Sequence, residues 1–324
     1  MKTPRRILIS PLDWGLGHAS RIIPLIDRYI EQGDNVIIAG SGMSLNLLKK
    51  QFPTLESIEI PSFKMKYSAG KSQVWAVAKA FPKLIYYSFK EHKVLKRIVK
   101  DKNIDFIISD NRFGLYHKII PSAYITHQLM IKLPRKWSFL EGLVAFVHRC
   151  IINKFTECWV PDYKESEHSL AGELSHPSKM PRNAKYIGPL SRISTRRIPY
   201  GRENITANLA LAILSGAEPQ RTILEKELLT SLQNDTHENI ILVQGKIEAE
   251  QKVTQVGKVT VYNFMNTEEL QENILKADEI ICRSGYSSIM DLHALGKLQN
   301  ATLIPTPGQT EQEYLAEYIS NHIK

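Results

Sequence analysis

Short runs of apolar residues alternate with stretches of helical periodicity along most of the chain. The first run, Ile7 to Ser10, leads into a glycine-rich turn, and apolar residues then recur at helical spacing from Ile22 to Ile30. Gly33 ends that helix, and Val36 to Ala39 form the next run. Further strands are predicted at 57–60, 106–109, 123–126 and 158–160. Strands that alternate with helices in this way predict a parallel sheet covered on both faces.

A second series of the same kind follows residue 204. Its strands are predicted at 209–214, 240–243, 259–262, 279–282 and 302–304, and its helices near 222–233, 267–276, 286–295 and 311–323. Residues 188–204, which separate the two series, are rich in proline, glycine and arginine and indicate an interdomain linker. We therefore predict an α/β protein with two Rossmann-like domains, residues 1–187 and 205–324, which face each other across a cleft.

Length and composition agree with two compact domains. The chain has 324 residues, of which 43% are apolar. Its three cysteines form no CxxC pair, so neither a disulfide framework nor a zinc finger is expected. The first apolar run is shorter than the core of a signal peptide, and no stretch approaches the roughly 20 apolar residues of a membrane span. We expect a cytoplasmic protein.

Charge is distributed unevenly along the chain. Residues 1–200 hold 32 Lys and Arg against 16 Asp and Glu, whereas residues 201–324 hold 10 against 17. Residues 61–100 contain ten basic residues and a single acid, Glu91, interleaved with aromatic residues. This pattern fits docking on an anionic membrane surface at the inner face of the membrane, and the alternative is a packed helix with a solvated basic face. Nucleic-acid binding is not expected, because no RRM, KH or zinc pattern accompanies the charge.

The first glycine-rich turn offers candidate binding and catalytic groups. Gly15 and Gly17 match two glycines of a GxGxxG motif, but the second strand ends without the acid that a dinucleotide ribose requires, so NAD is disfavoured. The glycines would let backbone N–H groups approach a phosphate or a sugar, or serve only a tight turn. His18 follows at the expected helix start, where the helix dipole favours a neutral imidazole suited to a general base.

Asp110 is the second candidate catalytic residue. It follows the strand at 106–109, at a strand's carboxyl end, where it can orient His18 or contact an acceptor hydroxyl. Packing for His18 and a turn or helix-cap role for Asp110 are the alternatives.

The segment 282–291 predicts an anion cradle. A strand ends there and a helix opens directly after it, so backbone N–H groups, hydroxyls and an arginine can surround a diphosphate. The residues of this cradle are Arg283, Ser284, Gly285, Ser287 and Ser288. Asp291 shares a helix face with the last two and can accept from ribose hydroxyls. Helix capping by Ser284 or Ser287 is the alternative.

In their order and spacing, these motifs resemble the GT-B glycosyltransferases, most closely the family 28 branch that includes the lipid II-forming N-acetylglucosaminyltransferase. Further matching segments are Thr126-His127-Gln128, Gly188 to Arg192, Leu214-Ser215-Gly216, Pro305 and Gln312-Glu313. The resemblance implies transfer of a sugar from a nucleotide sugar, expected to be a UDP-sugar, to a hydroxyl of a lipid-linked or cell-envelope glycan acceptor.

The same resemblance implies roles for individual residues. Phosphates would be bound by Arg192, Ser284, Gly285 and Ser287 or Ser288, the base by Phe264, the ribose by Asp291 and the sugar by Gln312 and Glu313. Ser215 and Gly216 would complete the donor side, and His127 and Gln128 would lie on the acceptor side. Glu313 stands where the family has a second Gln, which leaves the donor sugar open. Relative to the family the chain ends early, so either a truncated sequence or a genuinely reduced C-terminal domain is expected.

No metal or cofactor is expected besides the nucleotide sugar itself. The chain contains no Asp-x-Asp, so the metal-bound diphosphate mode of the other major glycosyltransferase fold lacks its ligands. A helix dipole with an arginine can stabilise a departing nucleoside diphosphate instead. We therefore predict inverting, metal-independent transfer with His18 or Asp110 as the base. Two alternatives remain open, a GT-B-fold UDP-sugar 2-epimerase and a non-catalytic module that binds nucleotide sugars or lipids.

Overall fold

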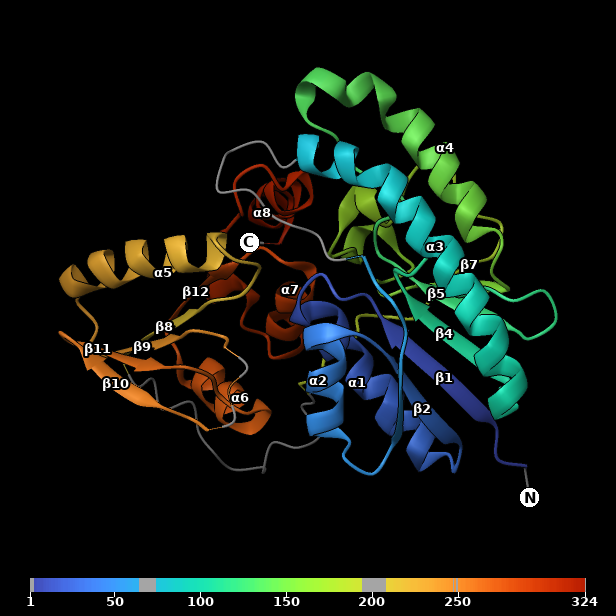
Figure 1. Cartoon of the computed structure of the whole chain (residues 1–324). Helices are drawn as coiled ribbons and strands as arrows, with labels where there is room; N and C mark the ends of the chain where they lie inside the picture. Colours follow the sequence, from blue (N-terminus) through green and yellow to red (C-terminus); the bar gives the residue numbers. More distant parts are fainter. Residues whose placement is uncertain (1–2, 64–73, 194–207, 247, 249, 324) are drawn as a thin grey trace. The chain divides into compact units, whose positions relative to one another are not determined.

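The structure is a computed structural model that describes residues 3–63, 74–193, 208–246, 248 and 250–323, without the side chains of 74–81 (Figure 1). The described part divides into two compact units, one up to residue 190 and one from residue 191 onward. Most of the predicted linker, residues 194–204, lies outside the described residues.

The first unit is built on a seven-stranded parallel sheet in the order β3-β2-β1-β4-β5-β6-β7. Its strands are β1 (Arg6–Pro11), β2 (Asn35–Gly40), β3 (Glu56–Glu59), β4 (Phe106–Asp110), β5 (Ser122–Ile125), β6 (Glu157–Val160) and β7 (Ala184–Tyr186). Its helices are α1 (Leu16–Glu31), α2 (Gly42–Gln51), α3 (Val74–Lys102) and α4 (Glu141–Ile152), with short 3₁₀ turns at Arg135–Leu140, Ser166–His168 and Gly172–Leu174.

Helix α3 packs against this sheet through its apolar face. Leu95 and Ile98 belong to one buried cluster with Leu8 of β1, Ile37 of β2 and Ile107 of β4. Strands buried on both faces read as continuous apolar runs, which is why β1, β2 and β4 were recognisable in the sequence.

The second unit contains a six-stranded sheet in the order β10-β11-β9-β8-β12-β13. Its strands are β8 (Leu209–Ile213), β9 (Asn239–Val243), β10 (Val253–Val256), β11 (Val259–Tyr262), β12 (Glu279–Arg283) and β13 (Ala301–Ile304). All pairs are parallel except β10 with β11. Its helices are α5 (Gln220–Ser231), α6 (Thr267–Lys276), α7 (Tyr286–Ala294) and α8 (Thr310–His322), with 3₁₀ turns at Leu232–Asn234 and Leu298–Asn300.

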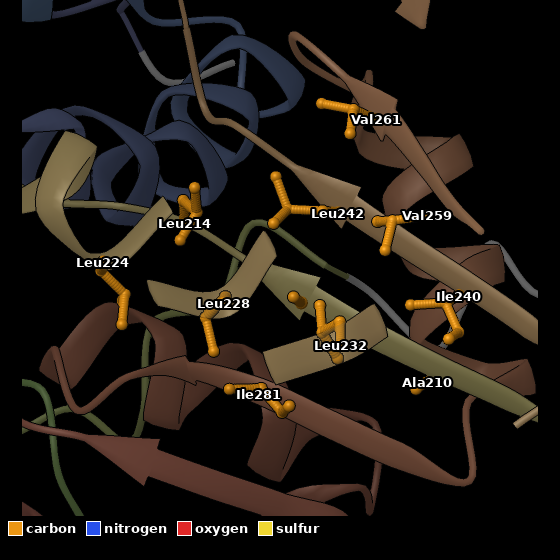
Figure 2. Close-up of a cluster of buried hydrophobic side chains, with 11 residues drawn as sticks. Ala210, Leu214, Leu224, Leu228, Leu232, Ile240, Leu242, Val259, Val261 and Ile281 are labelled. Atoms are coloured by element: carbon orange, nitrogen blue, oxygen red, sulfur yellow. The ribbon is translucent and has the colours of Figure 1, made fainter. Parts of the chain in front are cut away.

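Helix α5 supplies much of the core on one face of this second sheet. Figure 2 shows Leu224 and Leu228 of α5 directed toward the strands, where they join a buried cluster with Leu242 of β9, Val259 of β11 and Ile281 of β12. Burying apolar surface of this kind contributes about 25 cal/mol per Å² to folding. The unit therefore has a hydrophobic core of its own.

The predicted fold class of two Rossmann-like domains is confirmed, whereas the expectation that they face each other across a cleft stays a prediction. The sequence missed two strands. β7 has three residues, none of them buried, and β10 is exposed along its whole length. β7 is too short for an alternating pattern, and β10 buries no apolar face, so neither strand leaves a clear pattern in the sequence.

Strand order fixes one special position in each sheet. β1 lies between β2 and β4, and β8 lies between β9 and β12, so the chain connections diverge at these two strands. Ligands of open parallel sheets bind beyond the carboxyl ends of the strands at such a switch point. Candidate residues after β1, β4, β8 and β12 are therefore well placed.

Candidate active site

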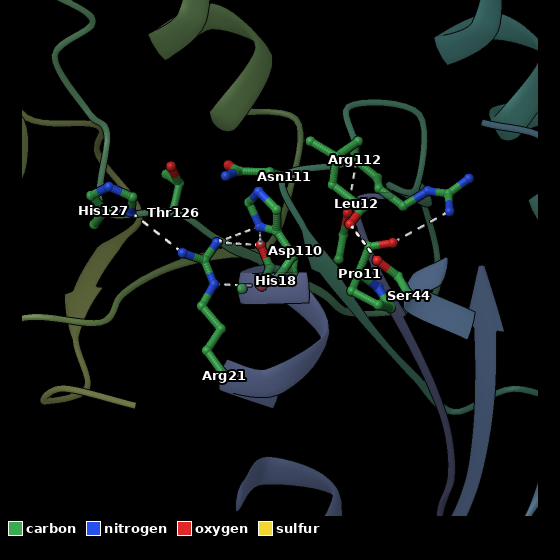
Figure 3. A network of polar contacts seen from close by, with 12 residues as sticks. Pro11, Leu12, His18, Arg21, Ser44, Asp110, Asn111, Arg112, Thr126 and His127 are labelled. Atoms are coloured by element: carbon green, nitrogen blue, oxygen red, sulfur yellow. Dashed lines mark hydrogen bonds and ion pairs between the residues drawn. The ribbon is translucent and has the colours of Figure 1, made fainter. Parts of the chain in front are cut away.

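His18 and Asp110 meet at the switch point of the first sheet. β1 and β4 pair in parallel with Pro11 opposite Asp110, and α1 brings His18 back over the ends of both strands. The His18 Nδ1 atom lies 2.9 Å from Asp110 Oδ1 (Figure 3). The His18 side chain is 20% exposed, whereas that of Asp110 is fully buried. The imidazole is thus held on its Nδ1 side by a carboxylate that solvent does not reach.

The charge of Asp110 is maintained by a buried arginine. Burial alone would raise the pKa of the Asp110 carboxyl, but the Arg21 charge and the contact with His18 outweigh it and lower this pKa to about 2. Arg21 Nε donates to Asp110 Oδ2 at 2.6 Å, and Arg21 Nη2 donates to Oδ1. Asp110 is therefore a permanent carboxylate at neutral pH, with both oxygens engaged by protein groups.

Arg21 was missed by the sequence analysis. It lies three residues after His18 in α1 and thus on the same helix face, a spacing that could have revealed it. Its Nη2 atom is 3.1 Å from His18 Nδ1, and its Nη1 atom is 3.4 Å from His127 Nδ1 (Figure 3). One guanidinium thus contacts the three predicted side chains His18, Asp110 and His127.

The two predicted acceptor-side residues follow β5. His127 is 3% exposed and reaches the polar cluster through Arg21. Gln128 is half-buried, and its backbone N–H donates to Thr126 Oγ1 at 3.1 Å. The structure therefore brings His127 into contact with the cluster, whereas the hydrogen bond described for Gln128 is with Thr126.

The glycine-rich loop opens α1. Gly15 is the N-cap residue with φ of 139°, a conformation that favours glycine, and space around its Cα is open. Gly17 lies inside the first turn of α1, and its carbonyl accepts from Ser20 Oγ at 3.1 Å. No acidic side chain occupies this first turn, which follows the carboxyl end of β1.

In the second unit, Ser215, Gly216 and Gly285 gather at one edge of the sheet. Ser215 and Gly216 follow β8, Gly285 follows β12, and these two strands are paired neighbours. Gly216 has φ of 96° and is exposed, and Gly285 caps α7 with open space beside it. Ser287 and Ser288 lie half-buried in the first turn of α7.

Two members of the predicted cradle instead hold the fold together. Arg283 is 3% exposed, and its guanidinium donates to the carbonyl oxygens of Pro305 at 2.9 Å and Gln220 at 3.0 Å. Ser284 is fully buried, and its Oγ donates to the Gln312 carbonyl at 2.8 Å. Arg283 is the last residue of β12 and Ser284 follows it, and their side chains point into the fold toward α5 and α8. Both side chains thus have partners within the fold, and their role as phosphate ligands stays a prediction.

Asp291 and Arg192, predicted to bind ribose and phosphate, lie next to each other. Arg192 Nε is 3.6 Å from Asp291 Oδ2, and Ser191 Oγ donates to Asp291 Oδ1 at 2.6 Å. Burial raises the pKa of Asp291, against the opposing effects of Arg192 and Ser191. One carboxylate oxygen is thus already engaged, which leaves room for fewer ribose contacts than the sequence suggested.

The remaining donor candidates lie beyond the carboxyl ends of β11 and β13, Phe264 in a loop and Gln312 and Glu313 in the first turn of α8. Phe264 is half-buried between β11 and α6. Gln312 accepts from the Thr306 N–H at 2.9 Å and donates to Gln309 at 2.7 Å, and Glu313 accepts from the Gly308 N–H at 2.9 Å. Both side chains of α8 therefore shape the loop before the helix, and a sugar would have to replace or add to these contacts.

Comparison with known proteins shows similarity to glycosyltransferases. Residues 211–324 match the glycosyltransferase family 28 C-terminal domain. An uncharacterized glycosyltransferase of Methanosarcina acetivorans is 24% identical over 95% of this chain and 81% of its own length. A UDP-N-acetylglucosamine--N-acetylmuramyl-(pentapeptide) pyrophosphoryl-undecaprenol N-acetylglucosamine transferase of a Sulfurihydrogenibium species is 24% identical over 98% of this chain and 83% of its length. The C-terminal part of the chain carries the family 28 glycosyltransferase domain, and nearly the whole chain is similar to glycosyltransferases.

Solved structures agree on the fold of this glycosyltransferase. A UDP-glucosyltransferase from Polygonum tinctorium superposes with a TM-score of 0.62, covering 99% of this chain and 84% of that one at 11% identity. A putative UDP-N-acetylglucosamine 2-epimerase from Listeria monocytogenes reaches 0.57, covering 99% and 88% at 10% identity. The fold is therefore shared by transferases and an epimerase-like protein.

One side-chain group in the described part of the glycosyltransferase has the spacing of a metal site. Ligand atoms of Asp235, His237 and Glu279 lie within 4.8 Å of one another. They stand before or at the amino ends of β9 and β12, the sheet edge opposite to Gly216 and Gly285. His237 Nδ1 contacts Asp235 Oδ1 at 2.6 Å, and the Lys258 ammonium contacts the Asp235 carbonyl. Some ligand atoms of this group therefore already have hydrogen-bond partners, and the group lies far from the predicted donor ligands.

Proposed function

We propose that the protein transfers a sugar from a nucleotide sugar, most simply a UDP-sugar, to a hydroxyl group of a lipid-linked or cell-envelope glycan acceptor. The observation that carries the proposal is the contact of 2.9 Å between His18 and the buried Asp110 at the switch point of the first sheet. A partly exposed imidazole backed by a permanent carboxylate is suited to general-base catalysis.

In the proposed reaction His18 is the base and Asp110 its positioning partner. With Nδ1–H donating to Asp110, the Nε2 lone pair takes the proton of the acceptor hydroxyl. The acceptor oxygen then bonds to the anomeric carbon as the bond to the diphosphate breaks, with inversion, and the nucleoside diphosphate leaves with the electron pair. Asp110 is unsuited to be the base itself, because its pKa is about 2 and Arg21 engages both oxygens.

The donor diphosphate is proposed to bind at the opening of α7. Gly285 lets the phosphates approach the first turn of this nine-residue helix, whose dipole stabilises negative charge. Arg192 is 27% exposed and supplies a positive charge beside Asp291. This arrangement needs no metal ion to balance the departing diphosphate.

The acceptor is proposed to use an aromatic surface of the first unit. Trp14 of the glycine-rich loop, Phe63, Tyr87 and Tyr86 form a chain of ring contacts with centroid separations of 6.4, 5.9 and 5.7 Å. Three of these residues, together with Ser62 and Lys83, line a hollow of about 480 Å³. Such a surface suits an apolar acceptor with a negatively charged group near Lys83.

A membrane surface is the proposed source of such acceptors. Large apolar side chains are exposed on α3, where Tyr86 is 63% and Phe89 71% exposed, and around α4, where Phe139 is 75% and Leu143 60% exposed. Much of the basic segment 61–100 lies outside the described side chains, but Lys90 and Lys93 are exposed near Phe89 in sequence. In the described part of the chain, no helix is both long and apolar enough to cross a bilayer.

The proposal is tested by a panel of nucleotide sugars with and without candidate acceptors. Thermal unfolding identifies the donor, since a ligand at a hundredfold excess over its Kd stabilises by about 2.7 kcal/mol. Release of the nucleoside diphosphate that requires an acceptor and persists in EDTA is expected. Failure of every nucleotide sugar to bind would contradict the proposal.

A 2-epimerase is the second candidate, because the fold is shared with an epimerase-like structure. An epimerase needs no acceptor hydroxyl. Interconversion of two UDP-sugars without acceptor would favour it, whereas nucleotide release only with acceptor would exclude it.

A further inference from the structure

The buried carboxylate of Asp110 requires a positively charged partner. Its side chain is fully buried, and an isolated carboxylate in such a place is strongly destabilised unless it is paired or protonated. Two contacting groups can carry the compensating charge, Arg21 and His18. Which of them does so decides whether His18 is available as a base.

An imidazole that neutralises Asp110 holds protons on both nitrogens and cannot accept another one. Arg21 removes this demand, because its guanidinium is always charged and contacts both Asp110 oxygens, through Nε at 2.6 Å and through Nη2. With the carboxylate already neutralised, the imidazole can stay neutral and donate its Nδ1–H to Oδ1. The Nε2 lone pair then remains free.

We propose that Arg21 is a positioning residue whose permanent charge keeps His18 neutral and therefore competent as the general base. The inference rests on the proposed function for its catalytic meaning, but its electrostatic content concerns the free protein. Arg21 is 2% exposed, so it acts through His18 and Asp110 and not by touching the acceptor.

The other titratable groups around Asp110 do not replace Arg21. On β5, the Tyr124 hydroxyl feels the Asp110 charge, and burial raises its pKa well above the usual value, so it stays neutral. His127 follows β5, and its Nδ1 lies 3.4 Å from Arg21 Nη1, where a second positive charge would be repelled. Among the described residues that contact Asp110, the permanent cation is therefore Arg21.

The test measures the titration of His18 by NMR in the full chain labelled with ¹⁵N-histidine, with signals assigned by their loss in His18→Gln. In Arg21→Met the midpoint of His18 is expected to move to higher pH by about 1 to 3 units, because the carboxylate loses its other cation. Arg21→Lys keeps the charge and should move it less. Where sugar transfer can be assayed, the acid limb of the pH dependence of kcat/KM for Arg21→Met should also move to higher pH.

Two matched variants separate electrostatics from loss of structure. In Asp110→Asn the midpoint should fall, because His18 then faces the guanidinium without a carboxylate. In Asp110→Asn with Arg21→Met, which removes the ion pair as a unit, the midpoint should lie below that of Arg21→Met. An unchanged midpoint in folded Arg21→Met, or no fall in Asp110→Asn, would overturn the inference.

The outcome is distinguishable from failure of the proposed function. The titration uses no donor or acceptor, so a protein that transfers no sugar still reports on Arg21. Conversely, an active enzyme in which His18 does not respond to Arg21 retains the proposed function and loses this inference.

Discussion

At the residue scale, the most consequential positions are buried polar side chains that the fold holds in one charge state. Asp110 stays ionised because of Arg21, and His148 stays neutral at pH 7 because burial disfavours its charged form and lowers its pKa. His148 of α4 is 5% exposed, and its Nε2 lies 3.5 Å from the Tyr124 hydroxyl. The same physical effect, burial, thus yields opposite outcomes according to whether a counter-charge is present.

His148 predicts an acid-dependent loss of stability. Burial lowers its pKa from 6.5 to about 4, so between these values the unfolded chain binds more protons than the folded one. Its contribution is fully present above pH 6.5 and falls by about 3 kcal/mol as the pH drops to 4. Urea unfolding of the wild type and of His148→Leu at pH 7 and pH 4 measures this.

The difference between the two proteins isolates His148 from the other titrating groups. The wild type should lose more unfolding free energy than His148→Leu between the two pH values. Equal losses in both proteins would show that His148 does not stay neutral in the fold.

Sequence reasoning found His18 and Asp110 because strand ends and glycine-rich turns leave a local signal. It could not show the contacts of Arg283 and Ser284, because a strand-end Arg-Ser-Gly does not tell which way the side chains turn. In the fold they donate to the backbone carbonyls of Gln220 and Gln312. It missed Arg21, because the partner of this buried charge, Asp110, lies 89 residues away in sequence. Residue types at turns are local, whereas charge compensation depends on the tertiary fold.

At the element scale, the carboxyl ends of β8 and β9 depend on a close backbone approach. Leu214 N–H donates to the Val243 carbonyl at 2.8 Å directly after β8, and Gly245 follows β9 with φ of 66°. A Cβ at Gly245 would lie 2.4 Å from the Leu214 carbonyl oxygen, which belongs to the backbone and cannot rotate away. This contact sets the path of the loop that carries Ser215 and Gly216.

Gly245→Ala is therefore expected to destabilise the protein by about 1 to 3 kcal/mol, because it adds a backbone clash to an unfavourable positive φ. Gly142→Ala in α4 is the matched control, since no atom lies within 4 Å of its added Cβ. There the substitution should stabilise by up to about 1 kcal/mol through helix propensity. Chemical denaturation compares them, and equal stability of the two variants would refute the role assigned to Gly245.

At the scale of the whole molecule, the two halves of the chain divide chemistry between them. The N-terminal half carries the basic excess, the exposed apolar side chains of α3 and α4 and the proposed base, and the C-terminal half carries the family 28 domain and the proposed donor ligands. The uneven distribution of charge along the sequence indicated that the two halves differ in kind. It could not reveal which apolar residues are exposed, because exposure depends on how each helix packs.

The exposed side chains predict binding to anionic membranes. Replacing Phe139, Leu143 and Phe146 together by serine should reduce co-sedimentation with vesicles that contain anionic lipid by about tenfold or more, since each buried large apolar side chain contributes roughly 1.5 kcal/mol or more. Val253→Ser with Val256→Ser on the exposed strand β10 is the control and should bind as the wild type does. If the Val253 and Val256 variant lost binding and the triple variant did not, the membrane contact would lie on the second unit instead.

The central claim, sugar transfer with His18 as the base, is tested most directly by the rate of acceptor-dependent nucleoside diphosphate release in wild type and His18→Gln. Loss of a general base should lower kcat by about 10² to 10⁴-fold, while the Kd for the nucleotide sugar changes little. Equal rates in the two proteins would contradict the claim.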